Sequence, residues 1–234
     1  MMDSKLVASL KNTIWDGTKD ILMDFTEVGL DTITENEVLK EIPIVSTIFR
    51  LGNAVVAIRD RHLLKKTLTF VAEVNDGTIS NEKLRKHKEE LEKNTEKMNA
   101  ELESILVILD RINKTNKSIV LANFYKSYMD EAISFDWEDF CICAEMLEVF
   151  SMYDVKSLKD IYEKESYEDG DKFDVFVMQK FNGLGLVSFF NNMKVNFGGK
   201  SVFAFINHAG TIFYELGIQK SYEKILKTND KGVF

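Results

Sequence analysis

The sequence predicts a mainly α protein with a little β structure near the C-terminal end. Three observations favour this fold class. Apolar residues recur at helical spacing along most of the chain, and Pro43 is the only proline. Alternation typical of strands is confined to about residues 193–206. The 234 residues, 45% hydrophobic and 29% charged, are enough for one large domain or two small ones.

The first half of the chain is expected to pack around a helix that begins at Pro43. Helical periodicity runs from about Lys5 to Leu30, with a break at Gly17, and a polar connection leads to Pro43. Apolar residues then surround most of the helix, which predicts a central core helix. Its expected buried residues are Ile48, Leu51, Val55 and Ile58. The apolar stripe shifts after residue 58, so we expect either a kink at 59–62 or a continuous helix that changes packing partner.

A helical hairpin is predicted between residues 80 and 112. Ser80 is a good N-cap for a polar helix, and Asn94 can end that helix and cap the next one. Leucine, methionine and isoleucine then follow at regular spacing as far as Ile112. One continuous helix is the alternative, because five apolar residues stand seven apart: Leu84, Leu91, Met98, Ile105 and Ile112.

The last half is expected to alternate helices with one β-hairpin. The sequence predicts helices at about 121–132, 135–150, 154–162, 172–184, 208–216 and 221–227. The apolar residues that mark the helix at 172–184 are Phe173, Phe176, Val177, Phe181 and Leu184. The acidic segment 163–171 is expected to be a loop. Strands at 193–197 and 201–206 should be joined by a tight turn at residues 198–199, and Gly217 should end the helix that Asn207 begins.

Three helices followed by a hairpin and another helix is the order of a winged helix. The sequence Leu184-Gly185-Leu186-Val187, and later the stretch from Ile206 to Phe213, resemble the pattern common in bacterial winged helices. The resemblance implies a winged-helix-like α+β domain with one β-hairpin over 134–234. An N-terminal helical bundle would occupy 1–116, and a connecting helix 117–133.

The charge of this predicted domain argues against DNA binding, the function that winged helices often have. Residues 134–184 hold five lysines against thirteen aspartates and glutamates, and the whole chain has a net charge of −8. Phosphate neutralisation supplies most nonspecific DNA affinity, and so acidic a surface would repel DNA. We therefore expect no specific nucleic-acid partner, and a domain that contacts protein or is purely structural.

The whole chain also resembles helical bacterial proteins of phages and phage-defence loci, including the abortive-infection alpha type. The resemblance is carried by Ile42-Pro43-Ile44-Val45, by the stretch from Ile58 to Lys66, and by Gly210-x-x-Phe213-Tyr214. It implies a role in phage–host conflict, as a defence component or an inhibitor of one. It brings no catalytic residues with it.

No catalytic, cofactor-binding or metal-binding motif is found, so we expect a protein that is not an enzyme. His87 is expected at the surface, and His208 in a structural position. Cys141 and Cys143 stand two apart on a predicted helix, which places them on different faces, where they cannot bind one metal together. No disulfide framework and no signal peptide are indicated, and a cytoplasmic location is expected.

The candidate binding site is the basic run that follows the apolar part of the central helix. We expect it to bind another protein, from the host or a phage, through Arg59, Arg61, His62, Lys65 and Lys66. These groups spread around the helix instead of forming the single stripe that a membrane surface would favour. A purely structural role is the simplest interpretation of the run. A membrane-perturbing effector using residues 42–58, or a DNA-binding regulator, are alternatives. The oligomeric state is left open.

Overall fold

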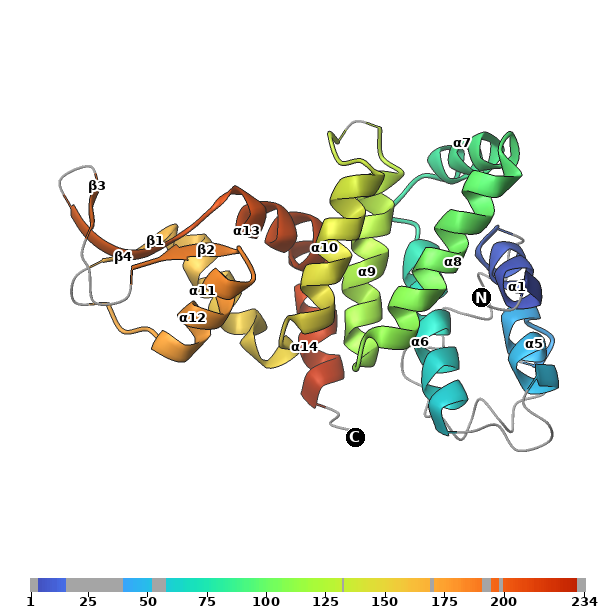
Figure 1. Cartoon of the computed structure of the whole chain (residues 1–234), viewed down its shortest axis with the longest axis horizontal. Coiled ribbons are helices and arrows are strands. Elements are labelled where there is room, and N and C mark those ends of the chain that lie inside the picture. The colour runs from blue at the N-terminus through green and yellow to red at the C-terminus, as the bar shows by residue number, and fades with distance from the viewer. Residues whose placement is uncertain are drawn as a thin grey trace. The chain divides into compact units, whose positions relative to one another are not determined.

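The computed structural model describes residues 4–15, 40–51, 58–131, 133–168, 171–190, 195–197 and 200–230. The chain is mainly helical with a small antiparallel sheet, which confirms the predicted class (Figure 1). It forms two compact units, Met1–Phe140 and Cys141–Phe234. We call them the first and second unit and describe each by itself.

The first unit contains six helices among its described residues, and α10 begins in it. Their bounds are α1 Ser4–Trp15, α5 Pro43–Leu51, α6 Ile58–Val74, α7 Asn81–Glu92, α8 Thr95–Arg111 and α9 Thr115–Tyr128. Helix α10, Trp137–Val149, crosses the division between the units. The expected division at 116 and 133 therefore differs from the observed one, because the presumed connecting helix, α9, belongs to the first unit.

The central helix of the first unit is α9, not the helix that begins at Pro43. Helix α9 makes its most extensive packing with α6, and residues 116–127 are all buried. Helix α5 is only nine residues long and packs mainly on α1, where the hydroxyl of Thr13 accepts a hydrogen bond from the N–H of Ile44 at 3.1 Å. Sequence reasoning chose α5 because it is apolar on several sides; the polar residues of α9 hid its position.

Of the two alternatives at residues 59–62, the structure shows the helix without a break, because α6 runs from Ile58 to Val74. Helix α5 ends at Leu51, and residues 52–57 lie outside the described residues. Of the four expected core residues, Ile48 is buried as predicted. The side chains of Leu51 and Ile58, and Val55 as a whole, fall outside the description.

The hairpin of α7 and α8 is confirmed, and the single long helix is excluded. The Ser80 hydroxyl accepts the N–H of Lys83 at 3.3 Å, and the Asn94 side chain accepts that of Lys97 at 3.0 Å. These are the N-caps that the sequence predicted. Apolar residues at the expected spacing face the core: Leu84, Leu91, Met98, Leu102, Ile105, Leu109 and Ile112.

The second unit combines short helices with a four-stranded sheet. Its elements are η2 Met152–Asp154, α11 Val155–Lys164, β1 Ser166–Glu168, α12 Val175–Gly183, β2 Val187–Phe189, β3 Val195–Phe197, β4 Lys200–Ile206, α13 His208–Ile212, η3 Phe213–Ile218, η4 Gln219–Ser221 and α14 Tyr222–Asp230. Strand β4 is central: β1 pairs with one of its edges, and β2 and β3 pair with the other, all antiparallel.

Two of these strands were not predicted. Strand β1 lies in the segment expected to be a loop, and β2 follows α12 directly. Both strands pair with β4 at Ala204, which lies opposite Tyr167 of β1 and Phe189 of β2. Tyr167 and Ala204 are buried, so these residues mark the buried face of the sheet. Helices α11 and α12 lie along one side of the sheet (Figure 1). The strands β3 and β4 confirm the hairpin, whose turn at 198–199 is outside the described residues.

The predicted helix end at Gly217 is wrong. Helical structure continues from α13 through the π-helical segment η3 and the short η4 into α14, which ends at Asp230. Gly217 is buried inside η3. The cap at the start of α13 is confirmed, because the Asn207 side chain accepts the N–H of Gly210 at 2.9 Å.

Candidate functional site

The basic run of α6 divides into residues that are buried and residues that reach the surface. Lys66 is buried, whereas Arg61, His62 and Lys65 are half-buried. The side chain of Arg59 lies outside the described residues. Arg61 and Lys65 are four residues apart, so they lie on the same face of the helix, one turn apart.

Lys66 has a structural role that removes it from the candidate binding surface. Its ammonium donates hydrogen bonds to the carbonyl oxygens of Asp110, at 3.1 Å, and Ile112, at 2.8 Å. Helix α8 ends at Arg111, so this cation satisfies carbonyl groups at the negative end of that helix. Sequence reasoning grouped Lys66 with its neighbours because helical periodicity does not show which carbonyl groups a buried lysine will meet.

Arg61 and Lys65 have no such compensation within the described ranges of the chain. Among the described residues, no carboxylate lies within ion-pair distance of either side chain. The Nε of Arg61 is buried and has no hydrogen-bond partner there. Burial lowers the pKa of the Lys65 ammonium, and no neighbouring carboxylate opposes that shift. Arg61 also lies in the first turn of α6, where the helix dipole disfavours a cation.

The charged core of the first unit contrasts with this pair, because its cation is satisfied. The ammonium of Lys126 on α9 lies 3.3 Å from the Glu73 carboxylate and 3.0 Å from that of Asp76, and it donates to the Thr78 hydroxyl at 3.1 Å. Burial alone would raise the pKa of Asp76. Hydrogen bonds from Thr78 and the charge of Lys126 outweigh burial and lower that pKa.

A second buried network surrounds Glu101 on α8 and corrects the placement of His87. The Glu101 carboxylate accepts hydrogen bonds from the hydroxyls of Tyr125, at 2.7 Å, and Tyr128, at 3.2 Å, and lies 3.0 Å from Nε2 of His87. His87 is buried, not at the surface as predicted, because it lies between Leu84 and Leu91 on the inner face of α7. That spacing was visible in the sequence.

The Glu101 network is suited to holding helices together and not to chemistry on a substrate. Burial, followed by the nearby Glu101 carboxylate, raises the pKa of Tyr125 well above its ordinary value. The phenol therefore stays protonated and donates a hydrogen bond. Glu101 and Tyr125 are both buried, so the network offers no exposed reactive group. It connects α7, α8 and α9 through polar contacts that fit one arrangement.

The remaining sequence candidates do not form a catalytic or metal-binding group in the described part of the chain. Within those residues, no set of three histidine, cysteine, aspartate or glutamate side chains is placed to hold a metal ion. Neither Cys141 nor Cys143 forms a disulfide bond with another described residue. His208, which was expected in a structural position, is exposed at the start of α13.

Comparison of the chain with protein-family models, curated proteins and solved structures finds no match. Structural features must therefore carry the functional argument. No helix in the described ranges is long and apolar enough to cross a membrane. The apolar segment 42–58, considered as a membrane segment, contains helix α5 and only the first residue of α6.

The second unit carries an exposed feature that sequence reasoning missed. Phe176 is one of the apolar residues that mark its helix in the sequence, but the side chain is exposed. The helix begins at Val175, after Phe173, whose ring packs on that of Tyr167 at 5.0 Å between centroids. The buried face of α12 is therefore Val177, Met178 and Phe181. This leaves Phe176 on the opposite side of the helix.

Proposed function

We propose that the protein acts by binding another protein whose carboxylates pair with Arg61 and Lys65. The observation that carries the proposal is a pair of half-buried cations, one turn apart, with no carboxylate beside them in the described residues. Buried or half-buried charges are costly unless they are paired. The buried Lys66 and Lys126 are both satisfied, so the cost at Arg61 and Lys65 is exceptional within this unit.

The biological setting is also a proposal. The resemblance of Ile42–Val45, of the run 58–66 and of the Gly210–Tyr214 sequence to abortive-infection proteins supports a role in phage–host conflict. The protein would act there as a defence component, or an inhibitor of one, by association and not by catalysis. A winged-helix-like second unit, with α11 and α12 before the β3–β4 hairpin and α13 after it, is supported by the element order.

The test is a double charge reversal, Arg61→Glu with Lys65→Glu, compared with the parent protein as bait in a bacterial lysate. The parent should capture a protein that the variant loses. With that partner purified, the variant should bind at least about tenfold more weakly, equal to about 1.4 kcal/mol. Mass spectrometry identifies the partner, and titration calorimetry measures its affinity.

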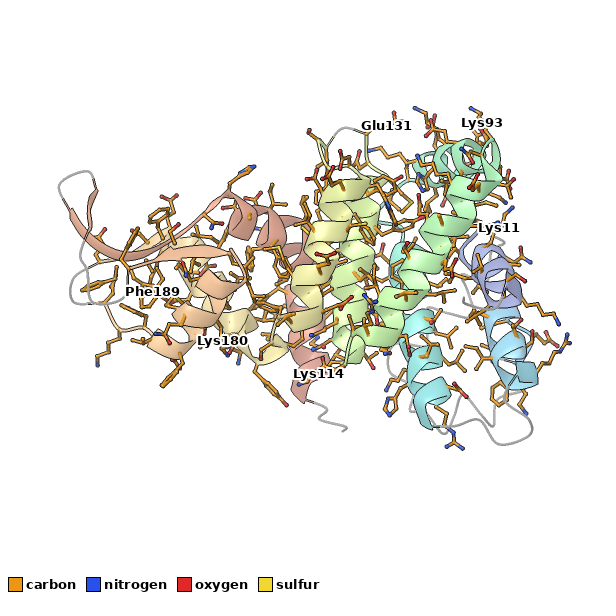
Figure 2. All side chains as sticks on the ribbon, viewed as in Figure 1. Lys11, Lys93, Lys114, Glu131, Lys180 and Phe189 are labelled. Atoms are coloured by element: carbon orange, nitrogen blue, oxygen red, sulfur yellow. The ribbon has the colours of Figure 1, made fainter. Side chains whose placement is uncertain are left out.

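The matched control reverses two cations elsewhere in the first unit, Arg85→Glu with Lys93→Glu. Arg85 is exposed on α7, and Lys93 follows the end of that helix (Figure 2). This control should bind like the parent, and all three proteins should unfold at similar temperatures. Equal capture by the parent and the Arg61/Lys65 variant would refute the proposal.

Liposomes distinguish the membrane-perturbing alternative. The parent protein should not release dye from liposomes that contain anionic lipid, because Lys66 is turned inward and the remaining cations do not form one stripe opposite an apolar face. Release by the parent that the double charge reversal abolishes would replace protein binding with membrane perturbation as the function of this site.

A further inference from the structure

The large apolar side chains that the described residues expose all belong to the second unit. They are Ile142, Val149, Tyr153, Val175 and Phe176. Three of them keep most of their surface accessible to solvent. The exposed fraction is 79% for Phe176, 74% for Val149 and 73% for Tyr153. Single exposed apolar residues are ordinary, but a group of them marks an interaction surface.

Packing beneath these residues brings the end of α10 and the segment η2 against the second half of α12. The rings of Phe150 and Phe181 stack with centroids 5.9 Å apart, and the Lys180 ammonium on α12 pairs with the Asp154 carboxylate of η2. Figure 2 labels Lys180. Tyr153 is the neighbour of Asp154, and Phe176 lies one helical turn before Lys180. Each aromatic residue is therefore close along the chain to one member of this ion pair.

We define the Phe176 surface as Val149, Tyr153, Val175 and Phe176. Its most exposed residue is held in place before any partner binds. The Asp174 carboxylate caps α12 and accepts the N–H groups of Phe176, at 2.8 Å, and Val177, at 3.3 Å. The cap fixes the backbone of the first turn of α12, so less backbone freedom is lost when Phe176 is bound.

The charge around the Phe176 surface indicates the chemistry of its partner. Residues 142–154 and 171–180 contain five carboxylates against two lysines, a net charge of −3. Lys180 is already paired with Asp154. Glu145, Asp171 and Asp174 are exposed. An apolar surface with an acidic surrounding is complementary to a segment that presents apolar residues bordered by lysine or arginine.

We propose that the Phe176 surface binds a cationic amphipathic segment of another protein, with Phe176 as its central anchor. This surface lies on the second unit and would bind a cationic partner, whereas the Arg61/Lys65 site would bind carboxylates. The inference therefore goes beyond the proposed function. The protein would then have a second binding surface, which prefers the opposite charge and can be tested independently of the first.

The probe is a fluorescent amphipathic helix of leucine and lysine, about five turns long, titrated with the full-length protein. Its counterpart has glutamate in place of every lysine. We expect fluorescence anisotropy to show saturable binding of the lysine peptide and none of the glutamate peptide. Phe176→Ser should weaken binding at least about tenfold. Because Phe176 is exposed, the variant should keep the unfolding temperature of the parent.

Charge variants separate this surface from general attraction to an acidic protein. Glu145→Gln with Asp171→Asn should weaken binding of the lysine peptide. Removing two carboxylates from the first unit, Glu89→Gln with Glu96→Gln, should leave binding unchanged; both glutamates are exposed on α7 and α8. If this control weakens binding as much as the surface variant does, the attraction is not local and the proposal fails.

Four further results would overturn the proposal. The first is no detectable binding of the lysine peptide, and the second is binding of the glutamate peptide with the same affinity. The third is reversible self-association of the parent protein in sedimentation that Phe176→Ser abolishes, which would make a second copy of this chain the occupant. Equal binding by the parent and Phe176→Ser would equally exclude Phe176 as the anchor.

Discussion

Individual buried charges in the first unit are stable because each one meets a specific partner. Lys126 faces two carboxylates and a hydroxyl, and Lys66 faces two carbonyl oxygens. Such contacts offset the cost of removing an ammonium group from water. The same reasoning makes Arg61 and Lys65 exceptional, since their partial burial is not offset within the described residues.

Replacing Lys126 with methionine tests the value of its ion pairs. The change keeps an apolar stem of similar length and removes the positive charge beside Glu73, whose side chain is 2% exposed. We expect the free energy of unfolding to fall by about 3–5 kcal/mol, measured by urea denaturation. Lys86→Met is the control: its ion pair with Glu131 is exposed, so stability should hardly change. Similar losses in both variants would contradict this account.

Asp76 predicts how part of this stability depends on pH. Its pKa is lowered in the folded protein, so its contribution is complete above the unfolded pKa of about 4 and is lost as pH falls through the folded value. The stability difference between the parent and Asp76→Asn should be constant from about pH 7 to 5 and shrink below about pH 4. Denaturation across this range measures it. A difference that grew on acidification would reverse the assigned sign.

At the scale of elements, a close backbone approach connects the start of α13 to the turn after α12. The Asn207 side-chain amide donates a hydrogen bond to the carbonyl of Gly185 at 2.8 Å. Its side-chain oxygen caps α13 by accepting the N–H of Gly210. Gly185 has a φ of 74°, which glycine adopts without strain. A Cβ on Gly210 would lie 2.0 Å from the carbonyl oxygen of Leu186. Only glycine at residue 210 fits this arrangement.

Gly210→Ala should therefore destabilise the protein by at least about 1–3 kcal/mol, because the atom in the way belongs to the backbone. The matched change Gly183→Ala should be neutral or stabilise by up to about 1 kcal/mol. Gly183 lies at the end of α12, and a Cβ there would meet nothing within 4 Å. Chemical denaturation of both variants checks the pair. Equal stabilities would show that α13 can move away from Leu186 at no cost.

The elements also differ in how readily they can be predicted. Three helix starts were predicted from N-cap residues, whose side-chain oxygen accepts a hydrogen bond from a nearby backbone N–H. They are Ser80, Asn94 and Asn207. Strands β1 and β2 are short and lack the flanking Gly198-Gly199 turn that marks β3 and β4 in the sequence as a hairpin. They are strands because β4 supplies hydrogen-bonding partners from a distant part of the sequence.

At the scale of the whole molecule, the negative net charge disfavours DNA as a partner. The net charge is −8, and the segment 134–184 alone reaches this value. Affinity for duplex DNA should be no tighter than the nonspecific range of about 10⁻⁴ to 10⁻⁶ M at physiological salt. Fluorescence anisotropy with a pool of random-sequence duplexes measures it. Nanomolar affinity for any member of the pool would favour a DNA-binding regulator instead.

The sequence by itself determined the mainly helical class, the α7–α8 hairpin, the strands β3 and β4 and the caps. These depend on residues a few positions apart, within reach of local hydrogen bonds and helical periodicity. It also located the basic run from which Arg61 and Lys65 come. Each of these features is visible in the printed residues.

Only the tertiary structure decided which helix is central, which lysine of the basic run turns inward and which phenylalanine turns outward. Helix α9 is buried despite its polar residues, since α6 and the loop after it bring Glu73 and Asp76 to Lys126. Lys66 is buried because the end of α8 supplies carbonyl groups more than forty residues away in sequence. Phe176 is exposed because Val177, Met178 and Phe181 form the buried face of α12, which leaves Phe176 on the opposite side. Burial of a side chain depends on what distant segments place beside it, and no local pattern contains that information.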